Sequence, residues 1–266
     1  MTKEKIHQVK FYYLLNRALA IGTGQGIFPV NNILDLLLVS LDSPFVLYGQ
    51  NKEEICSTNI AFIKHGYRFF HQSYSPRIFF LYMLPLSPDQ NFLRENYSFQ
   101  VSPTHPEVSW IDESIPTIVD VLNQIDKEHT SASKADALLD KLINPKNLRP
   151  PTISVDKRIF SLVLKMLSDT QWIPDAKEAS RELNISESRF LSLFGQEAGM
   201  TYTHFKKVCK HKAFNEAFAK TMQLTESSYA ASYTDSAHFC NTFKNFHGLT
   251  PKQFYVTDSI EFFIQD

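Results

Sequence analysis

Glycine and cysteine are scarce in this sequence of 266 residues, and each shortage excludes a class of site. Only 8 glycines are present, which disfavours a glycine-rich loop that cradles phosphate. The three cysteines form neither a CxxC pair nor an even set for disulfides; they are Cys56, Cys209 and Cys240. We therefore expect reduced thiols, as is usual in the cytoplasm.

Long hydrophobic runs and an excess of charge are also missing. The longest apolar stretch, residues 78–86, is interrupted by Pro85 and is much shorter than a membrane span. The first residues carry charge where a secretion signal needs an apolar segment. The net charge of −1 neither indicates nor excludes a nucleic-acid partner. We expect a cytoplasmic protein without a membrane partner.

The composition is that of a soluble globular protein, with 43% hydrophobic and 21% charged residues. A proline-rich stretch predicts a linker at 147–155, between a domain at 1–146 and a domain at 156–266. In the first domain, β-branched and aromatic segments at 45–48, 60–64 and 78–83 indicate strands, and helical periodicity follows at 115–126 and 134–143. Helical periodicity resumes over 156–256. We predict an α+β fold of two domains, the first rich in strands and the second all-α.

The helical part contains an internal repeat, because residues 188–205 and 237–254 match when shifted by 49 positions. The matched pairs are Phe190 with Phe239, Phe194 with Phe243, Gly199 with Gly248, Met200 with Leu249, Thr201 with Thr250, and Phe205 with Phe254. Each copy has the pattern of a helix-turn-helix, whose second helix buries its phenylalanine pair and ends at the glycine. In the first turn we expect a left-handed Asn184 and a helix cap at Ser186. In the second, Thr234 or Asp235 is the expected cap.

The face opposite each phenylalanine pair predicts what the second helices offer to a partner. One face carries Ser188, Ser192 and Gly195, flanked by Arg189 and Leu191; the other carries Ala237, Asn241 and Lys244, flanked by His238 and Asn245. Small and polar side chains suit the major groove of double-stranded DNA, where Asn pairs with adenine. The alternative is that both are solvated helix faces, and the tandem arrangement favours DNA.

Residues 184–201 and 234–251 resemble the two helix-turn-helix signatures of AraC/XylS-type transcription regulators. The resemblance covers residues 156–256 and implies a seven-helix DNA-binding domain with a connecting helix at about 202–221. Carried over by position, the groove-facing residues are Ser188, Arg189, Leu191 and Ser192, then Ser236, Ala237, His238 and Asn241, with Lys244 towards phosphate. RNA polymerase, a small-molecule effector and a second copy of the chain are further expected partners.

The chain departs from the family pattern in three ways. Ser232 stands where the second turn usually has glycine, so a left-handed backbone there would be strained. Lys210 replaces an arginine, and Ser227 and Ser228 replace isoleucine and alanine. We expect these serines to weaken helix packing and make the second unit less rigid.

The connecting helix carries the only dense basic cluster, Lys206, Lys207, Lys210 and Lys212. We expect Lys206, Lys207 and Lys210 to contact DNA phosphates, with a solvated helix face as the alternative. Because residues 151–256 hold 13 basic and 10 acidic side chains, affinity from phosphate contacts should be modest.

The N-terminal half more faintly resembles the cupin-type sensor domain of some AraC relatives, over 37–47, 63–71 and 80–85. Such sensors often show a His-x-His pair where this chain has Val30, Asn31 and Asn32. Because His65 and His71 alone cannot make a three-ligand site, we expect no metal and no cofactor, and interpret His71 as a polar residue at a strand end.

The same half is rich in aromatic residues that we expect in its core, some of them lining an apolar cavity for a ligand. They are Phe69, Phe70, Tyr74, Phe79, Phe80 and Tyr82. The apolar stripes of the helices at 115–126 and 134–143 either pack a dimer partner, as the resemblance suggests, or cover the sheet.

No catalytic motif is present, so we do not expect an enzyme. The leading hypothesis is a sequence-specific transcription regulator of AraC/XylS type, modulated by a small ligand or by dimerisation through the N-terminal domain. The alternatives are a small-molecule-binding cupin that does not bind DNA and a protein-interaction antagonist.

Overall fold

The computed structural model describes residues 5–14, 17–73, 77–112, 115–127, 130–149, 155–255 and 259–264. Tyr74 and residues 150–154 of the predicted linker lie outside this set. By its contacts the chain divides into Met1–Pro151 with Phe243–Asp266, which we call the sheet unit, and Thr152–Thr242, which we call the helical unit. One division falls at the predicted linker. The other, after Thr242, was not anticipated.

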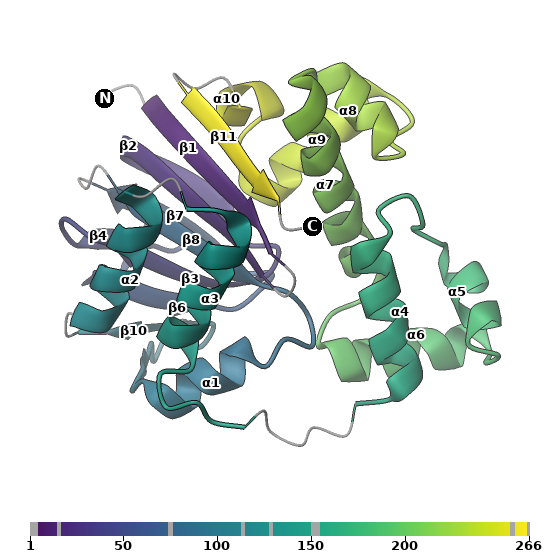
Figure 1. Cartoon of the computed structure of the whole chain (residues 1–266), viewed down its shortest axis with the longest axis horizontal. Helices are drawn as coiled ribbons and strands as arrows, with labels where there is room; N and C mark the ends of the chain where they lie inside the picture. The colour runs from purple at the N-terminus through teal and green to yellow at the C-terminus, as the bar shows by residue number, and fades with distance from the viewer. Residues whose placement is uncertain are drawn as a thin grey trace. The chain divides into compact units, whose positions relative to one another are not determined.

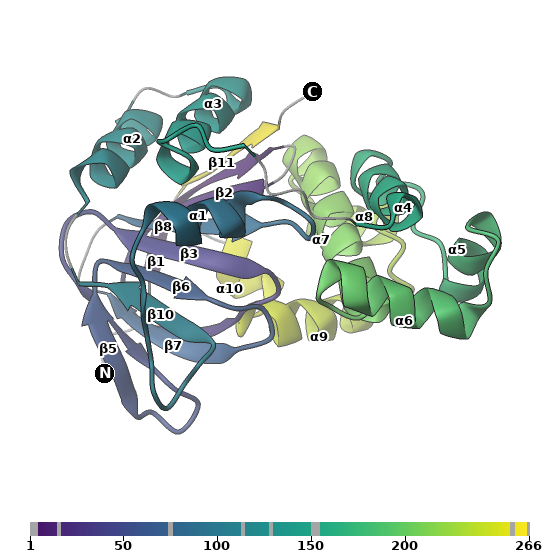
Figure 2. The same cartoon turned by 90° about the horizontal axis from the view of Figure 1, so that it is seen from below.

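The sheet unit is built on an 11-stranded sheet. Along it the order is β5-β4-β7-β2-β8-β3-β6-β10-β9, while β1 pairs with β2 and with β11 (Figures 1 and 2). The strands are β1 (Lys5–Tyr13), β2 (Arg17–Asn31), β3 (Asp35–Ser40), β4 (Phe45–Tyr48), β5 (Glu54–Thr58), β6 (Ile60–Ile63), β7 (Arg68–Ser73), β8 (Ile78–Met83), β9 (Gln100–Val101), β10 (Val108–Ile111) and β11 (Ser259–Ile264). The three strands expected from composition are therefore present, as β4, β6 and β8.

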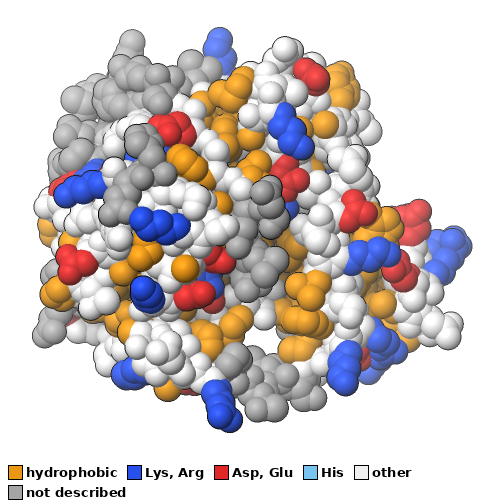
Figure 3. All heavy atoms as spheres, viewed as in Figure 1, with side chains coloured by type: hydrophobic (Ala, Val, Ile, Leu, Met, Phe, Trp, Pro, Cys, Tyr) orange, Lys and Arg blue, Asp and Glu red, His pale blue; other side chains and the backbone are white. Residues whose placement is uncertain are grey.

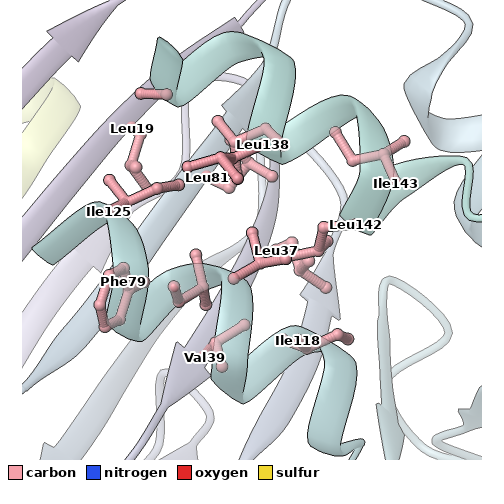
Figure 4. Packing of buried hydrophobic residues seen from close by; sticks show 14 of the residues in the cluster. Leu19, Leu37, Val39, Phe79, Leu81, Ile118, Ile125, Leu138, Leu142 and Ile143 are labelled. Atoms are coloured by element: carbon pink, nitrogen blue, oxygen red, sulfur yellow. The ribbon is translucent and has the colours of Figure 1, made fainter. Parts of the chain in front are cut away.

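Two helices, α2 (Pro116–Lys127) and α3 (Ala132–Ile143), lie on one face of the sheet (Figure 1). Their apolar stripes pack on the sheet's leucine, valine and phenylalanine side chains, as Figure 4 shows for Ile118, Ile125 and Leu138. A third helix, α1 (Asp89–Asn96), adds Phe92 and Leu93 to this core. The stripes therefore cover the sheet, and a dimer would have to use other surfaces.

His71 corrects one expectation. It lies inside β7 and not at a strand end, and it is buried at 4% exposure. Its ring packs between Phe28, with ring centroids 5.2 Å apart, and Phe80, at 5.5 Å. Burial lowers the pKa of His71 to about 4, so the imidazole is neutral at pH 7. His65 instead pairs with Asp35 (Nδ1 to Oδ1, 3.0 Å).

The described residues of the helical unit form five complete helices and the start of a sixth. They are α4 (Lys157–Ser168), α5 (Ala176–Glu182), α6 (Glu187–Ala198), α7 (Tyr202–Thr221), α8 (Leu224–Ala230) and α9 (Ser236–His247). Helix α9 continues past Thr242 into the sheet unit, where α10 (Pro251–Tyr255) follows. The two-part α+β architecture agrees with the predicted fold class. In the part of the chain that is described, no helix is long and apolar enough to span a membrane.

Candidate nucleic-acid interface

Helices α5 and α6 form the first helix-turn-helix. Asp175 opens α5 with a capping box, because its side chain accepts from Glu178 N while the Glu178 carboxylate accepts from Asp175 N. The turn places Asn184 in the left-handed region (φ 54°), as its residue type predicts. Ser186 then caps α6 by accepting from Arg189 N at 3.3 Å.

Helices α8 and α9 form the second helix-turn-helix with the same backbone bonds. Ser232 N donates to Tyr229 O (2.9 Å) and Tyr233 N to Ser228 O (3.1 Å), matching Asn184 and Ile185 of the first turn. Ser232 has φ 58°, the strained left-handed geometry expected of it. The second turn is one residue longer, since α8 starts 48 positions after α5 and α9 starts 49 after α6. Asp235, rather than Thr234, caps α9 by accepting from His238 N at 2.7 Å.

The phenylalanine pairs are buried, as the repeat predicts. Phe190 and Phe194 pack against Tyr202 of α7 with ring centroids 4.7 Å and 5.1 Å away. In the second unit, Phe239 stacks on Phe214 of α7 at 4.4 Å. Connecting helix α7 has the predicted bounds, and through these rings it packs against both helix-turn-helix units.

The outward faces of α6 and α9 carry the predicted DNA-reading residues. These residues are Ser188, Arg189, Leu191, Ser192, Ser236, Ala237, His238, Asn241 and Lys244. Ser236 is half-buried, and the other eight are exposed. Leu191 is an apolar side chain left 41% exposed, which suits a contact with a thymine methyl group. Asn241 is exposed and its amide makes no hydrogen bond with a described residue, so its donor and its acceptor are accessible to a partner.

The lysines of α7 have different surroundings. Lys210 Nζ donates to Ser232 O (2.8 Å) and lies 5.3 Å from the centre of the Tyr233 ring, so it fastens the second turn. Burial and the neighbouring Lys206 lower its pKa. Lys212 forms an ion pair with Glu216 on the same helix. Lys206 is half-buried and Lys207 exposed.

Ser227 and Ser228 are accommodated better than the sequence indicated. Both are fully buried, and each hydroxyl donates to a backbone carbonyl of the first turn or cap of α8. Ser227 Oγ donates to Gln223 O at 2.7 Å and Ser228 Oγ to Thr225 O at 2.8 Å. A buried polar group with a partner costs little, so α8 packs without an unpaired hydroxyl.

The surface charge is mixed in sign. Figure 3 shows basic and acidic side chains interspersed over the visible face of the molecule, and the net charge of the chain is −1. Binding to DNA would therefore depend on the few lysines and arginines of the reading helices and α7.

The sheet unit has a cavity of about 340 Å³, which sequence reasoning did not locate. Six of its lining residues are aromatic or apolar, and two cations and one carboxylate also line it. The lining residues are Phe62, Lys64, Leu93, Arg94, Tyr97, Phe99, Val101, Pro106, Glu107 and Ser109. The Arg94 guanidinium lies 6.0 Å from the Phe62 ring centre. Within the described residues, neither Lys64 nor Arg94 has a salt bridge.

A metal site is not formed by the side chains that the structure describes. Over those residues, no group of three His, Cys, Asp or Glu side chains could hold an ion. At the position of the expected histidines, Asn32 donates through Nδ2 to Ile63 O (3.0 Å) and Lys64 O (3.1 Å), which is a structural role.

Residues 179–255 match the family described as a helix-turn-helix domain. Among solved structures, an apo form of a ToxT variant from Vibrio cholerae is similar, with a TM-score of 0.58, 11% identity, and coverage of 92% of this chain and 98% of that chain. ToxT of Vibrio cholerae bound to an unsaturated fatty acid is similar with a TM-score of 0.53, 15% identity, and coverage of 96% and 97%. At these identities the likeness shows a shared fold. No curated protein sequence matches the chain.

Proposed function

We propose that this DNA-binding transcription regulator, whose residues 179–255 belong to the AraC-type helix-turn-helix family, reads one specific DNA sequence with both of its units. Regulators of this family are not enzymes. The observation that carries the proposal is the pair of reading helices, each with a buried phenylalanine pair on one face and small or polar exposed side chains on the other. Two such helices would enter two successive major grooves, which lie about 34 Å apart on one face of DNA.

The exposed side chains have distinct chemistry for this task. Asn241 can pair bidentately with adenine, and Leu191 can contact a thymine methyl group. Ser188 and Ser192 are weaker readers that allow close approach. Arg189 can pair with guanine or phosphate, while Lys206 and Lys207 on α7 would contact the backbone.

Footprinting on the DNA upstream of the gene tests the proposal. We expect protection of about 20 bp without a palindrome. Asn241→Ala should weaken binding by about 1–3 kcal/mol and relax the preference at one base pair. Asn51→Ala, in an exposed turn of the sheet unit, is the matched control and should bind normally. Protection of a single groove would mean that one unit is structural, and no protection at all would favour the antagonist alternative.

Salt dependence tests the phosphate contacts separately. Changing Lys206 and Lys207 together to Gln should weaken binding to specific and unrelated DNA alike. The slope of log affinity against log salt should fall by about 0.9 for each lost contact. A change confined to one DNA sequence would instead make these lysines base readers.

We also propose that residues 1–146 act as a cupin-like sensor that modulates DNA binding, with 147–155 as the linker and 156–266 as the DNA-binding domain. ToxT has been solved with an unsaturated fatty acid and with a naphthalenyl butenoic acid, both of which are apolar acids. The cavity of the sheet unit has complementary chemistry, because aromatic walls accompany Lys64 and Arg94, two cations without a salt bridge to any described residue.

Thermal unfolding in the presence of oleate tests the sensor proposal. A ligand at 100 times its Kd stabilises the folded state by about 2.7 kcal/mol. Lys64→Gln with Arg94→Gln should abolish the stabilisation, whereas Lys52→Gln in an exposed turn should keep it. Stabilisation that survives the double substitution would place the ligand elsewhere. Contact with RNA polymerase and homodimerisation remain predictions.

A further inference from the structure

We infer that the sheet unit positions the second reading helix, through an anchor made by Asn31 of β2 and the pairing of β1 with β11. The inference deepens the proposed function and rests on it, because it assigns control of the second half of the DNA site to the N-terminal sheet. Helix α9 starts in the helical unit and ends in the sheet unit, so its last turn packs among residues of the sheet unit.

The first part of the anchor is a side-chain cap on α9. Asn31 Nδ2 donates to Asn245 O at 2.8 Å and lies 3.4 Å from Lys244 O. Lys244 O already accepts from Gly248 N, whereas Asn245 is among the last residues of the helix, whose carbonyls lack partners within it. The Asn31 amide therefore satisfies the carbonyl of Asn245 and fixes the helix end. The sequence shows Asn31 only as the residue standing where a sensor histidine was expected. Its partner lies more than 200 positions away.

The second part is a backbone contact at the glycine that ends α9. Gly248 has φ 74°, and a Cβ built on it would lie 2.8 Å from Pro29 O and 2.9 Å from Pro29 Cβ. The strand β2 therefore touches the helix terminus where only glycine leaves room. At the matching Gly199 of the first unit (φ 69°), nothing lies within 4 Å of the same position.

The third part is a row of aromatic rings running from α9 to the sheet edge. Phe243 of α9 packs on Phe254 of α10 at 5.4 Å, and Phe254 packs on Phe11 of β1 at 5.8 Å. Phe11 in turn stacks on Phe262 of β11 at 5.4 Å with an interplanar angle of 16°.

The parallel pairing of β1 with β11 fixes the chain on the far side of this row. Its register runs from Gln8 with Ser259 to Tyr13 with Ile264 (Figure 1). Tyr12 also stacks on Phe263, with ring centroids 4.5 Å apart. The segment that follows α9 is thus held at both ends by strands of the N-terminal sheet.

These contacts make the position of α9, in the second helix-turn-helix, depend on the sheet, and this dependence can be measured. Asn31→Asp is nearly isosteric, but it replaces the donor with a carboxylate facing two carbonyl oxygens and the negative end of the α9 dipole. Phe262→Ala removes the ring stacked on Phe11. Asn51→Asp, with the same charge change in an exposed turn, is the control for Asn31→Asp.

Hydrogen exchange on the full chain tests the anchor without DNA. Exchange of the backbone amides at 243–248 should accelerate about five- to tenfold in Asn31→Asp and Phe262→Ala, since roughly one hydrogen bond or ring contact is lost. The last turn of α6, residues 194–199, should exchange as in the original protein, and Asn51→Asp should change neither segment. Unchanged exchange at 243–248 in both variants would overturn the inference.

Footprinting of the same variants tests the consequence for DNA. Protection of the half-site read by α9 should weaken by a similar factor, while the half-site read by α6 is retained. Equal weakening of both halves would overturn the assignment of the sheet to the second unit. If exchange accelerates but even the original protein protects no DNA, the anchor stands and the proposed DNA reading fails.

Discussion

Replacing each helix-terminal glycine by alanine should affect the two repeat units unequally. At Gly199 the methyl group meets open space, so the cost is only that of a left-handed alanine, about 1 kcal/mol. At Gly248 the same backbone cost applies, and the methyl group would also lie 2.8 Å from Pro29 O. Forcing backbone atoms apart adds about 1–3 kcal/mol, which makes the expected total roughly 2–4 kcal/mol.

Urea unfolding followed by tryptophan fluorescence can assign each loss to a unit. The chain has two tryptophans, and Trp110 lies in β10 of the sheet unit while Trp172 lies in the helical unit. With Trp172→Phe as background, Gly248→Ala should shift the transition seen by Trp110 strongly. With Trp110→Phe as background, Gly199→Ala should shift the transition seen by Trp172 weakly. Equal losses for the two glycines would refute the contact between β2 and the end of α9.

Three further outcomes are expected. Cys240 is exposed on α9 beside Asn241, so it should react with a thiol reagent and be protected by cognate DNA. Burial raises the pKa of the Cys56 and Cys209 thiols to about 12 and keeps them unreactive. Reactivity of Cys240 that DNA does not change would remove this face of α9 from the interface. Burial lowers the pKa of His211 to about 4, so the free energy of unfolding reported by Trp172 should fall as the pH drops from 6.5 towards 4, and less so in His211→Gln. A slope that is the same in both proteins would contradict the lowered pKa of this histidine. Lys210→Met should destabilise the helical unit by about 1–2 kcal/mol in a urea melt, because the carbonyl of Ser232 loses its charged donor; an unchanged midpoint would show that the bond contributes nothing.

The sequence alone determined the local structure of the reading units. The phenylalanine pairs, the turn residue Asn184 and the cap Ser186 follow from spacings of a few residues, whereas the bounds of α7 follow from the family resemblance. The structure confirms all of them. Such features are visible in sequence because helix periodicity and capping act over one or two turns. The same periodicity identified α2 and α3 but left open what their stripes cover, since an apolar face shows that it is buried and not by what.

Only the tertiary structure decided the contacts between distant segments. The pairing of β1 with β11 joins residues about 250 positions apart, and no local pattern encodes which strand will be a neighbour. The same holds for Asn31. In the sequence it is one of the residues that stand where a metal-binding histidine pair is expected, whereas in the fold its amide caps α9. The ammonium of Lys210 has a carbonyl partner in the second turn, which no local pattern indicated, and its contact with DNA stays a prediction. For Asn31 and Lys210, the sequence shows which hydrogen bonds the side chain can make. The partner depends on the fold, which brings groups that are distant in sequence within hydrogen-bonding distance.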